Sequence, residues 1–345
     1  MDALNLRGWR PIRIYWNGSQ VMVDWARLGD APHLQPFYQE SVSQQLRLPF
    51  HHAFRRQTSL AEMLAWHEQS PGLEPCLLTF HVSRCGSTLI PQAFAQSPQH
   101  LALSEPAPMD VLLREALVNG WLNEDEAVAA MRAWLSAWAQ RSDASSPALA
   151  AVSIKLDAWN THQAALLAKA WPNALPAFLT REPLAVLVSQ MRERAFYMVP
   201  GAMGEHFGPS GFSASEQATM PPAEYCSRIL ARIYADMARV ANPVQALVLD
   251  YAELPQAIET QLLPRLAWQP SASDIQAMRQ RLAQHGKRPT ESFVSDTSAK
   301  HAAALPEWQA LAAQWIEPHY QALLRQRAAQ APVDKTMKNL SEAVA

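Results

Sequence analysis

A short turn rich in small and hydroxyl side chains is the stretch of this sequence best suited to chemistry. The chain reads Phe80-His81-Val82-Ser83-Arg84-Cys85-Gly86-Ser87-Thr88-Leu89, an apolar run followed by a glycine turn and a helical pattern. Such a turn presents backbone N–H groups to an anion, and Ser87 and Thr88 add hydroxyl donors. The stretch predicts a phosphate site, although a turn that only caps a helix would have the same composition.

This turn differs from the phosphate loop of a nucleotide triphosphatase. That loop reads G-x-x-x-x-G-K-[ST], and alignment of Gly86 with its second glycine puts Ser87 at the lysine position. The positive charge lies instead at Arg84, two residues before the glycine. The sequence therefore favours an anion held without the usual lysine, and a magnesium-dependent kinase of a small molecule is the alternative.

The elements around this turn alternate between short apolar runs and helical patterns, which is typical of β-α units around a mostly parallel sheet. The chain is therefore predicted to be an α/β protein. The predicted strands cover residues 76–83, 101–104, 151–156, 174–180 and 245–250. Helices are expected near 87–97, 107–119, 123–141, 160–171, 183–195 and 223–241.

The two ends of the chain differ from this pattern. Alternating apolar residues flank Asn17-Gly18, which predicts a β-hairpin, and Ser59 with Glu62 has capping-box spacing before a helix. We expect residues 1–70 to form an extension packed on a main domain of residues 71–331, with helices dominating beyond residue 253. The glycines and prolines of 198–222 predict a loop or lid, and residues 332–345 a frayed tail.

Two motifs resemble the sulfotransferase superfamily. The first is Arg84-Cys85-Gly86-Ser87-Thr88, which is similar to the family's 5′-phosphosulfate loop, here with arginine where many members have lysine. The second is Arg181, at the end of a predicted strand, with Ser189 eight residues later on the next helix. In the family this pair binds a 3′-phosphate, whereas Arg181 alone would be an ordinary strand-end arginine. The resemblance implies a P-loop-type, three-layer α/β/α fold.

The resemblance also implies a reaction. Family members move a sulfuryl group in line from 3′-phosphoadenosine-5′-phosphosulfate (PAPS) to a hydroxyl or amine, need no metal ion, and leave 3′,5′-ADP. Glu105, after the second predicted strand, matches the general base of the glutamate branch. Arg84 and Lys155 would stabilise the transition state. The alternatives are that Glu105 only favours a helix N-terminus, and that Lys155 forms an ion pair with Asp157 or Glu105.

A basic residue near the C-terminal end would complete the family's 3′-phosphate site. Three candidates fit this role weakly, namely Lys287, Arg288 and Lys300. The order Gly286-Lys287-Arg288 departs from the family's Arg-Lys-Gly segment.

Composition limits the remaining possibilities. A chain of 345 residues with 49% hydrophobic residues, 17% charged residues and a net charge of -2 is globular, without the basic field of a nucleic-acid binder. Three cysteines and the lack of an apolar run of membrane length predict a cytoplasmic protein with no membrane partner. We expect a small-molecule or peptide acceptor, and a catalytically silent nucleotide-binding module is a further alternative. The oligomeric state cannot be read from the sequence.

Overall fold

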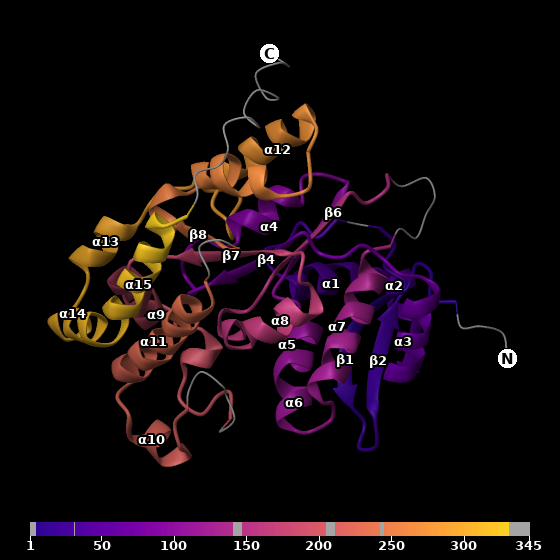
Figure 1. The fold of residues 1–345 in the computed structure, drawn as a ribbon, viewed down its shortest axis with the longest axis horizontal. Helices are drawn as coiled ribbons and strands as arrows, with labels where there is room; N and C mark the ends of the chain where they lie inside the picture. The colour runs from indigo at the N-terminus through magenta and orange to yellow at the C-terminus, as the bar shows by residue number, and fades with distance from the viewer. Residues whose placement is uncertain (1–4, 31, 141–146, 205–210, 242–244, 331–345) are drawn as a thin grey trace. The chain divides into compact units, whose positions relative to one another are not determined.

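The computed structural model of the protein describes residues 5–30, 32–140, 147–204, 211–241 and 245–330. Its main sheet has the order β5-β6-β4-β7-β8, and β5/β6 and β7/β8 pair in parallel (Figure 1). The five strands are His100–Ser104, Ala151–Lys155, Leu77–His81, Leu175–Thr180 and Leu247–Asp250. Each overlaps a predicted strand, so the predicted α/β class with a parallel sheet is confirmed.

The chain forms two compact units. The first contains Met1–Leu78, Thr88–Ala174 and Pro270–Phe293, and the second contains Thr79–Ser87, Leu175–Gln269 and Val294–Ala345. Both include buried strands made of nearly continuous apolar runs, as expected of parallel sheets covered on both faces. The predicted boundaries at residues 70 and 331 stay a prediction, and the expected frayed tail 332–345 lies outside the described residues.

An antiparallel sheet begins the first unit, with the order β1-β2-β3. Its strands are Arg10–Trp16, Val21–Ala26 and Arg55–Ser59. The predicted hairpin is confirmed: the Asn17 side chain accepts the N–H groups of Ser19 and Gln20 at 2.9 and 3.0 Å. The third strand was not predicted, because Arg-Arg-Gln-Thr-Ser lacks the apolar alternation that identifies a strand.

Helix α7 (Glu124–Trp138) supports this small sheet (Figure 1). Asn123 and Glu126 form a capping box at its start, and its acidic first turn suits the helix dipole. Trp134 and Trp138 donate their indole N–H groups to the carbonyl of Pro11 at 2.9 and 3.1 Å. The N-terminal strands are therefore fixed to this helix by hydrogen bonds as well as by apolar packing.

The other helices of the first unit precede, connect or follow these strands. The predicted Ser59–Glu62 capping box is present at the start of α3. The helices are α1 (Tyr38–Leu46), α2 (Pro49–Ala53), α3 (Leu60–Gln69), α4 (Leu89–Phe94), α5 (Ala107–Asp110) continuing through Val111–Glu115 into α6 (Ala116–Val118), the 3₁₀ segment Ala158–Gln163 with α8 (Ala164–Ala170), and α12 (Ala272–Leu282).

The second unit is mainly helical around β7 and β8, as expected for the C-terminal part. Its longest described helix buries Tyr225 and Tyr234 along one side. The helices are α9 (Pro183–Arg192), α10 (Ala214–Thr219), α11 (Pro222–Val240), α13 (Thr297–Ala302), α14 (Pro306–Leu311) continuing through Ala312–Ile316 into α15 (Glu317–Ala328), and short segments at Phe196–Met198, Tyr251–Glu253, Ile258–Leu262 and Leu263–Arg265.

Helix α10 corrects the expectation that 198–222 contains no regular element. Ser213 and Glu216 form a capping box there, which was overlooked among the glycines and prolines. Residues 205–210 of this stretch lie outside the described residues.

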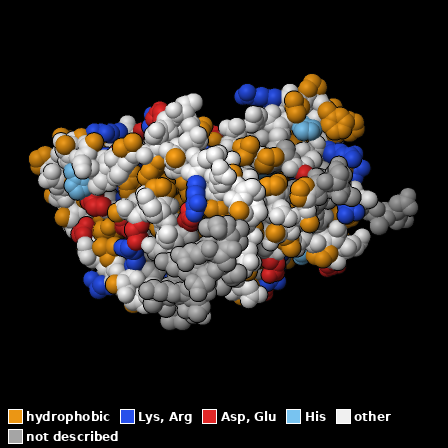
Figure 2. All heavy atoms as spheres, turned by 90° about the horizontal axis from the view of Figure 1, so that it is seen from above, with side chains coloured by type: hydrophobic (Ala, Val, Ile, Leu, Met, Phe, Trp, Pro, Cys, Tyr) orange, Lys and Arg blue, Asp and Glu red, His pale blue; other side chains and the backbone are white. Residues whose placement is uncertain are grey.

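The surface carries both signs of charge. Lys and Arg side chains and Asp and Glu side chains are interspersed on the face that Figure 2 shows. None of the described helices has the length and apolar character needed to cross a bilayer.

Candidate active site

The turn after β4 has an unusual backbone. Ser83 and Arg84 have φ angles of 67° and 49°, and Gly86 has 77°. Positive φ is uncommon for residues other than glycine and is kept only where the surroundings enforce it. Here the N–H of Ser83 donates to His81 Nδ1, and Gln190 donates to the Ser83 hydroxyl, both at 3.0 Å. The predicted phosphate turn is therefore held in a strained conformation.

Gly86 has no room for a side chain. A Cβ atom at this position would lie 3.1 Å from Leu254 Cδ1 and 3.2 Å from Tyr251 Cδ2. Glycine is thus required both by its φ angle and by the segment that follows β8.

The residues after Arg84 are buried, and three of their backbone N–H groups are available as hydrogen-bond donors. Cys85, Ser87 and Thr88 all have little exposed surface. The N–H groups of Gly86, Ser87 and Thr88 make no hydrogen bond to another described residue. Unpaired N–H groups in a strained turn can receive an anion.

The side chain of Arg84 points to the end of α9. Its guanidinium donates to the carbonyl of Glu193 at 2.5 Å and pairs with that residue's carboxylate at 3.2 Å. The N–H of Glu193 in turn donates to the carbonyl of Ser189 at 3.1 Å. The guanidinium of Arg84 therefore lies within one helical turn of Ser189, a predicted member of the second motif.

Arg181 joins the two predicted motifs. Its Nη1 donates to the carbonyl of Arg84 at 2.9 Å, although the residues are 97 positions apart. Its Nη2 donates to Asp296 at 2.5 Å and to the Thr297 hydroxyl at 3.1 Å. The ring of Tyr251 lies 3.8 Å from the guanidinium carbon. The 3′-phosphate candidate and the 5′-phosphosulfate candidate are thus neighbours in the second unit.

Two buried polar atoms at this position lack a partner. Arg181 Nε and Thr180 Oγ1 make no hydrogen bond within the described part of the chain. Buried donors of this kind are nearly always satisfied in native proteins. A phosphate or sulfate oxygen would satisfy the Arg181 Nε donor, so this arginine fits an anionic cofactor.

Sequence reasoning missed the residues that hold Arg181. Burial would raise the pKa of Asp296, but hydrogen bonds from Lys300 and Arg181 lower it to about 2. The Tyr234 hydroxyl donates to the Arg181 carbonyl at 2.5 Å. Of these residues, only Tyr251 could have been suggested from the sequence. It directly follows the predicted strand 245–250, and that strand pairs in parallel with the strand before Arg181.

Glu105 and Lys155 form a second cluster, in the first unit. Glu105 has a φ angle of 52°, and its N–H donates to the carbonyl of Lys155 at 2.7 Å. The Lys155 ammonium, on a buried side chain, forms an ion pair with the Glu105 carboxylate. The structure thus contains the ion pair that was one alternative for Lys155, and it brings together two of the three predicted catalytic residues, Glu105 and Lys155, but not Arg84.

A further carboxyl group beside this pair was not predicted as a site residue. Burial raises the pKa of Asp157 well above its usual value, and the charges of Glu105 and Asp110 raise it further. Asp110 itself is held by Arg114 at 2.9 Å and by the Trp159 indole at 2.6 Å. Asp157 therefore holds its proton more tightly than an ordinary carboxyl group, next to a charged pair.

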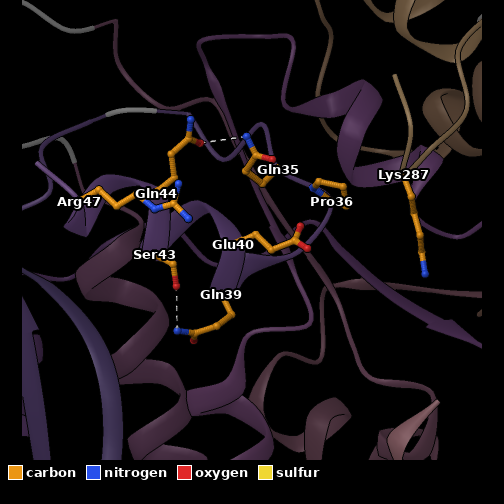
Figure 3. Close-up of a pocket in the computed structure, with 8 residues that line it drawn as sticks. All are labelled: Gln35, Pro36, Gln39, Glu40, Ser43, Gln44, Arg47 and Lys287. Carbon is orange, nitrogen blue, oxygen red and sulfur yellow. Dashed lines mark hydrogen bonds between the residues drawn. The ribbon is translucent and has the colours of Figure 1, made fainter. Parts of the chain in front are cut away.

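Phe37 links this cluster to a surface cavity of the first unit. The Nζ atoms of Lys155 and Lys287 lie 5.7 and 4.9 Å from the centre of its ring. The cavity has a volume of about 480 Å³, and Lys287 lines it opposite α1 (Figure 3). Its other lining residues are mostly polar, namely Gln35, Pro36, Gln39, Glu40, Ser43, Gln44 and Arg47.

The three C-terminal cations are placed differently. Lys300 is buried and paired with Asp296 at 2.9 Å, and Arg288 pairs with Glu291 at 2.9 Å. The segment of Lys287 lies against the start of α4, since a Cβ on Gly286 would be 3.5 Å from the N atom of Leu89. Lys300 is therefore the candidate that shares a carboxylate with Arg181, whereas the ammonium of Lys287 lies beside Phe37.

Among the described residues, no group of three or more His, Cys, Asp and Glu side chains could hold a metal ion.

Comparison with known proteins finds similarity only at the level of structure. No protein-family model and no curated protein matches the sequence. The sulfotransferase domain from the curacin biosynthetic pathway is 16% identical, with a TM-score of 0.44 over 70% of this chain and 98% of that domain. A sulfotransferase from Alicyclobacillus acidocaldarius is 16% identical, with a TM-score of 0.39 over 74% of this chain and 96% of that one.

A third solved structure, a sulfotransferase from Mycobacterium avium, is 13% identical, with a TM-score of 0.41 over 70% of this chain and 80% of that one. All three are sulfotransferases, the superfamily that the two motifs resemble. Because these TM-scores are below 0.5, the activity has to be argued from the residues of the chain.

Proposed function

We propose that the protein is a sulfotransferase that uses PAPS. The observation that supports this most is the hydrogen bond from Arg181 to the carbonyl of Arg84, together with the buried Nε of Arg181, which has no partner among the described residues. Such a site suits two anions of one nucleotide, one at the strained turn and one at Arg181. The absence of a lysine at Ser87 argues against the alternative of a kinase with an ordinary nucleotide loop.

In this proposal, different groups of the chain bind different parts of the sulfuryl donor. When bound, PAPS would supply the sulfuryl group and a phosphate as the leaving group. The N–H groups of Gly86, Ser87 and Thr88, with the Ser87 and Thr88 hydroxyls, would bind the 5′-phosphosulfate. Arg181 and Ser189 would bind the 3′-phosphate, with Lys300 as the third contact, because it pairs with the same Asp296 carboxylate as Arg181. Fixed donors aimed at the oxygen that gains charge lower the barrier without reorganisation.

The Glu105–Lys155 pair would act on the acceptor. The Glu105 carboxylate would accept the proton of the acceptor hydroxyl, and its positive φ angle and its bond to Lys155 fix its direction. Lys155 and Arg84 would supply positive charge to the sulfuryl oxygens and the leaving phosphate. Because amide, hydroxyl and charged groups line the cavity near Phe37, we propose an acceptor bearing several hydroxyl groups.

Replacement of Glu105 tests this assignment. In Glu105→Gln we expect release of 3′,5′-ADP from PAPS, with a panel of phenols, amines and sugars, to fall by about 10²–10⁴-fold. Binding of 3′,5′-ADP should be unchanged, because Glu105 is assigned to the acceptor. Glu68→Gln, an exposed carboxylate on α3, is the matched control and should keep full turnover.

Two results would contradict the proposal in different ways. Full turnover in Glu105→Gln would remove Glu105 as the base and leave sulfotransfer standing. No turnover and no binding of 3′,5′-ADP by the unaltered protein would remove the function itself.

A further inference from the structure

Helix α2 and the residues beside it expose large apolar side chains. Leu48, Phe50 and Phe54 have 55%, 54% and 46% of their surface exposed. The rings of Phe50 and Phe54 lie 4.5 Å apart, so they form one apolar surface. No residue of α2 is buried, so these side chains add little to the core. Exposed apolar groups gathered in one place usually mark a binding surface.

Positive charge surrounds this apolar surface. Arg47 and Arg55 flank α2 in the sequence, and the N–H of Arg27 donates to the carbonyl of Phe54 at 3.4 Å. All three arginines are exposed, and none is paired with a carboxylate of a described residue. The sequence contains no Asp or Glu from residue 41 to residue 61.

We propose that this surface, made of Leu48, Phe50, Phe54, Arg27, Arg47 and Arg55, binds an anionic lipid bilayer. Phenylalanine and leucine side chains insert at the boundary between headgroups and acyl chains, while neighbouring arginines bind lipid phosphates. A purely apolar surface would suit a protein partner equally well. Three exposed arginines, with no Asp or Glu in the sequence from residue 41 to residue 61, favour a surface that presents many negative charges.

This inference does not depend on the proposed function, and it changes one expectation from the sequence. We expected no membrane partner because no apolar run is long enough to span a bilayer. Binding at the lipid surface needs no such run, only exposed apolar groups beside positive charge. Arg47 also lines the cavity next to α1, so the lipid surface would lie near the entrance of that cavity.

Flotation of the full chain with lipid vesicles tests the proposal. The protein should float with vesicles of phosphatidylcholine and phosphatidylserine, float poorly with phosphatidylcholine alone, and dissociate as salt is raised. Two double variants, Phe50→Ser with Phe54→Ser and Arg47→Gln with Arg55→Gln, should each bind at least about tenfold more weakly. Thermal unfolding checks that both variants are folded.

Matched controls come from exposed residues elsewhere in the chain. Phe196 has 68% of its surface exposed, and the side chain of Arg13 is 66% exposed. Phe196→Ser and Arg13→Gln should bind vesicles like the unaltered protein. Lack of binding to any vesicle, equal binding to both lipid compositions, or unchanged binding by the double variants would overturn the proposal. Conversion of a dimer to a monomer by the phenylalanine variant, without vesicle binding, would assign the surface to a second copy.

Discussion

Backbone strain is concentrated at individual residues of the candidate site. The structure gives positive φ angles to three described residues other than glycine, and these are Ser83, Arg84 and Glu105. Each such residue costs of order 1–3 kcal/mol and is usually kept for a functional reason. Two of them belong to the predicted phosphate turn, and the third is the predicted base. The strain therefore supports the same residues that the motifs indicated.

Replacement of the single residue Gly86 should change the stability of the protein. Gly86→Ala should lower the free energy of unfolding by about 2 kcal/mol, because a Cβ atom adds steric overlap to an unfavourable φ angle. Gly29→Ala is the control: its φ angle is 68°, with no atom within 4 Å of the added Cβ. Urea unfolding measures both. An equal loss in the two variants would show that the contact with Leu254 and Tyr251 is unimportant.

Asp296 gives a prediction about pH. Its pKa is about 2 in the folded protein against 3.8 ordinarily, so its contribution to stability is complete above about pH 5 and is lost as pH falls toward 2. Because the carboxylate is about half exposed, that contribution is about 1 kcal/mol.

Unfolding by urea between pH 7 and pH 3 tests this contribution. Asp296→Asn should be less stable than the unaltered protein at pH 7, and the difference should shrink as pH falls. The surface variant Glu68→Gln should differ little at any pH. A difference for Asp296→Asn that grows toward pH 3 would contradict the assignment.

At the scale of elements, local signals explain most of the helix starts. Ser59, Asn123, Ser213 and Ser271 each form a capping box with the residue three positions later. The segment Pro71-Gly72, which follows α3, is instead positioned by its contacts with α7. The N–H of Gly72 donates to the Ser136 hydroxyl at 2.5 Å, and a Cβ on Gly72 would overlap the Ser136 carbonyl oxygen.

A side chain at position 72 should therefore push this segment away from α7. We expect Gly72→Ala to lower the free energy of unfolding by about 3 kcal/mol, since backbone atoms cannot move aside as a flexible side chain can. In Gly120→Ala the φ angle is unfavourable, but no atom lies within 4 Å of the added Cβ. This variant should lower the free energy of unfolding by about 1 kcal/mol. Urea unfolding of both variants measures the difference. Equal losses would contradict the close contact.

For the whole molecule, ligand preference separates the proposed function from a kinase. A ligand that binds the native state raises stability by RT ln(1 + [L]/Kd), about 2.7 kcal/mol at a hundred times Kd. The thermal midpoint should rise with 3′,5′-ADP more than with AMP, and ATP with magnesium should have little effect. Arg181→Lys should reduce the shift with 3′,5′-ADP, because lysine cannot reproduce the contacts of a guanidinium. Stabilisation by ATP with magnesium alone would favour the kinase.

The sequence by itself determined the positions of the main-sheet strands, several of the helix starts and the two motifs, because these depend on apolar periodicity, capping residues and short spacings. Residue type and short spacings were also enough to propose Arg84, Glu105, Lys155 and Arg181 as site residues. It could not identify β3, whose residues become a strand only by pairing with β2. Nor could it identify Asp296 as the partner of Arg181, since the two are 115 positions apart.

Only the tertiary structure decided which groups meet. It placed the guanidinium of Arg181 on the backbone of Arg84 and paired the predicted base with Lys155. It also left Phe50 and Phe54 in solvent, although their types favour burial. The physical reason is that local preferences act over a few residues, whereas contacts, burial and strain depend on parts of the chain that folding brings together.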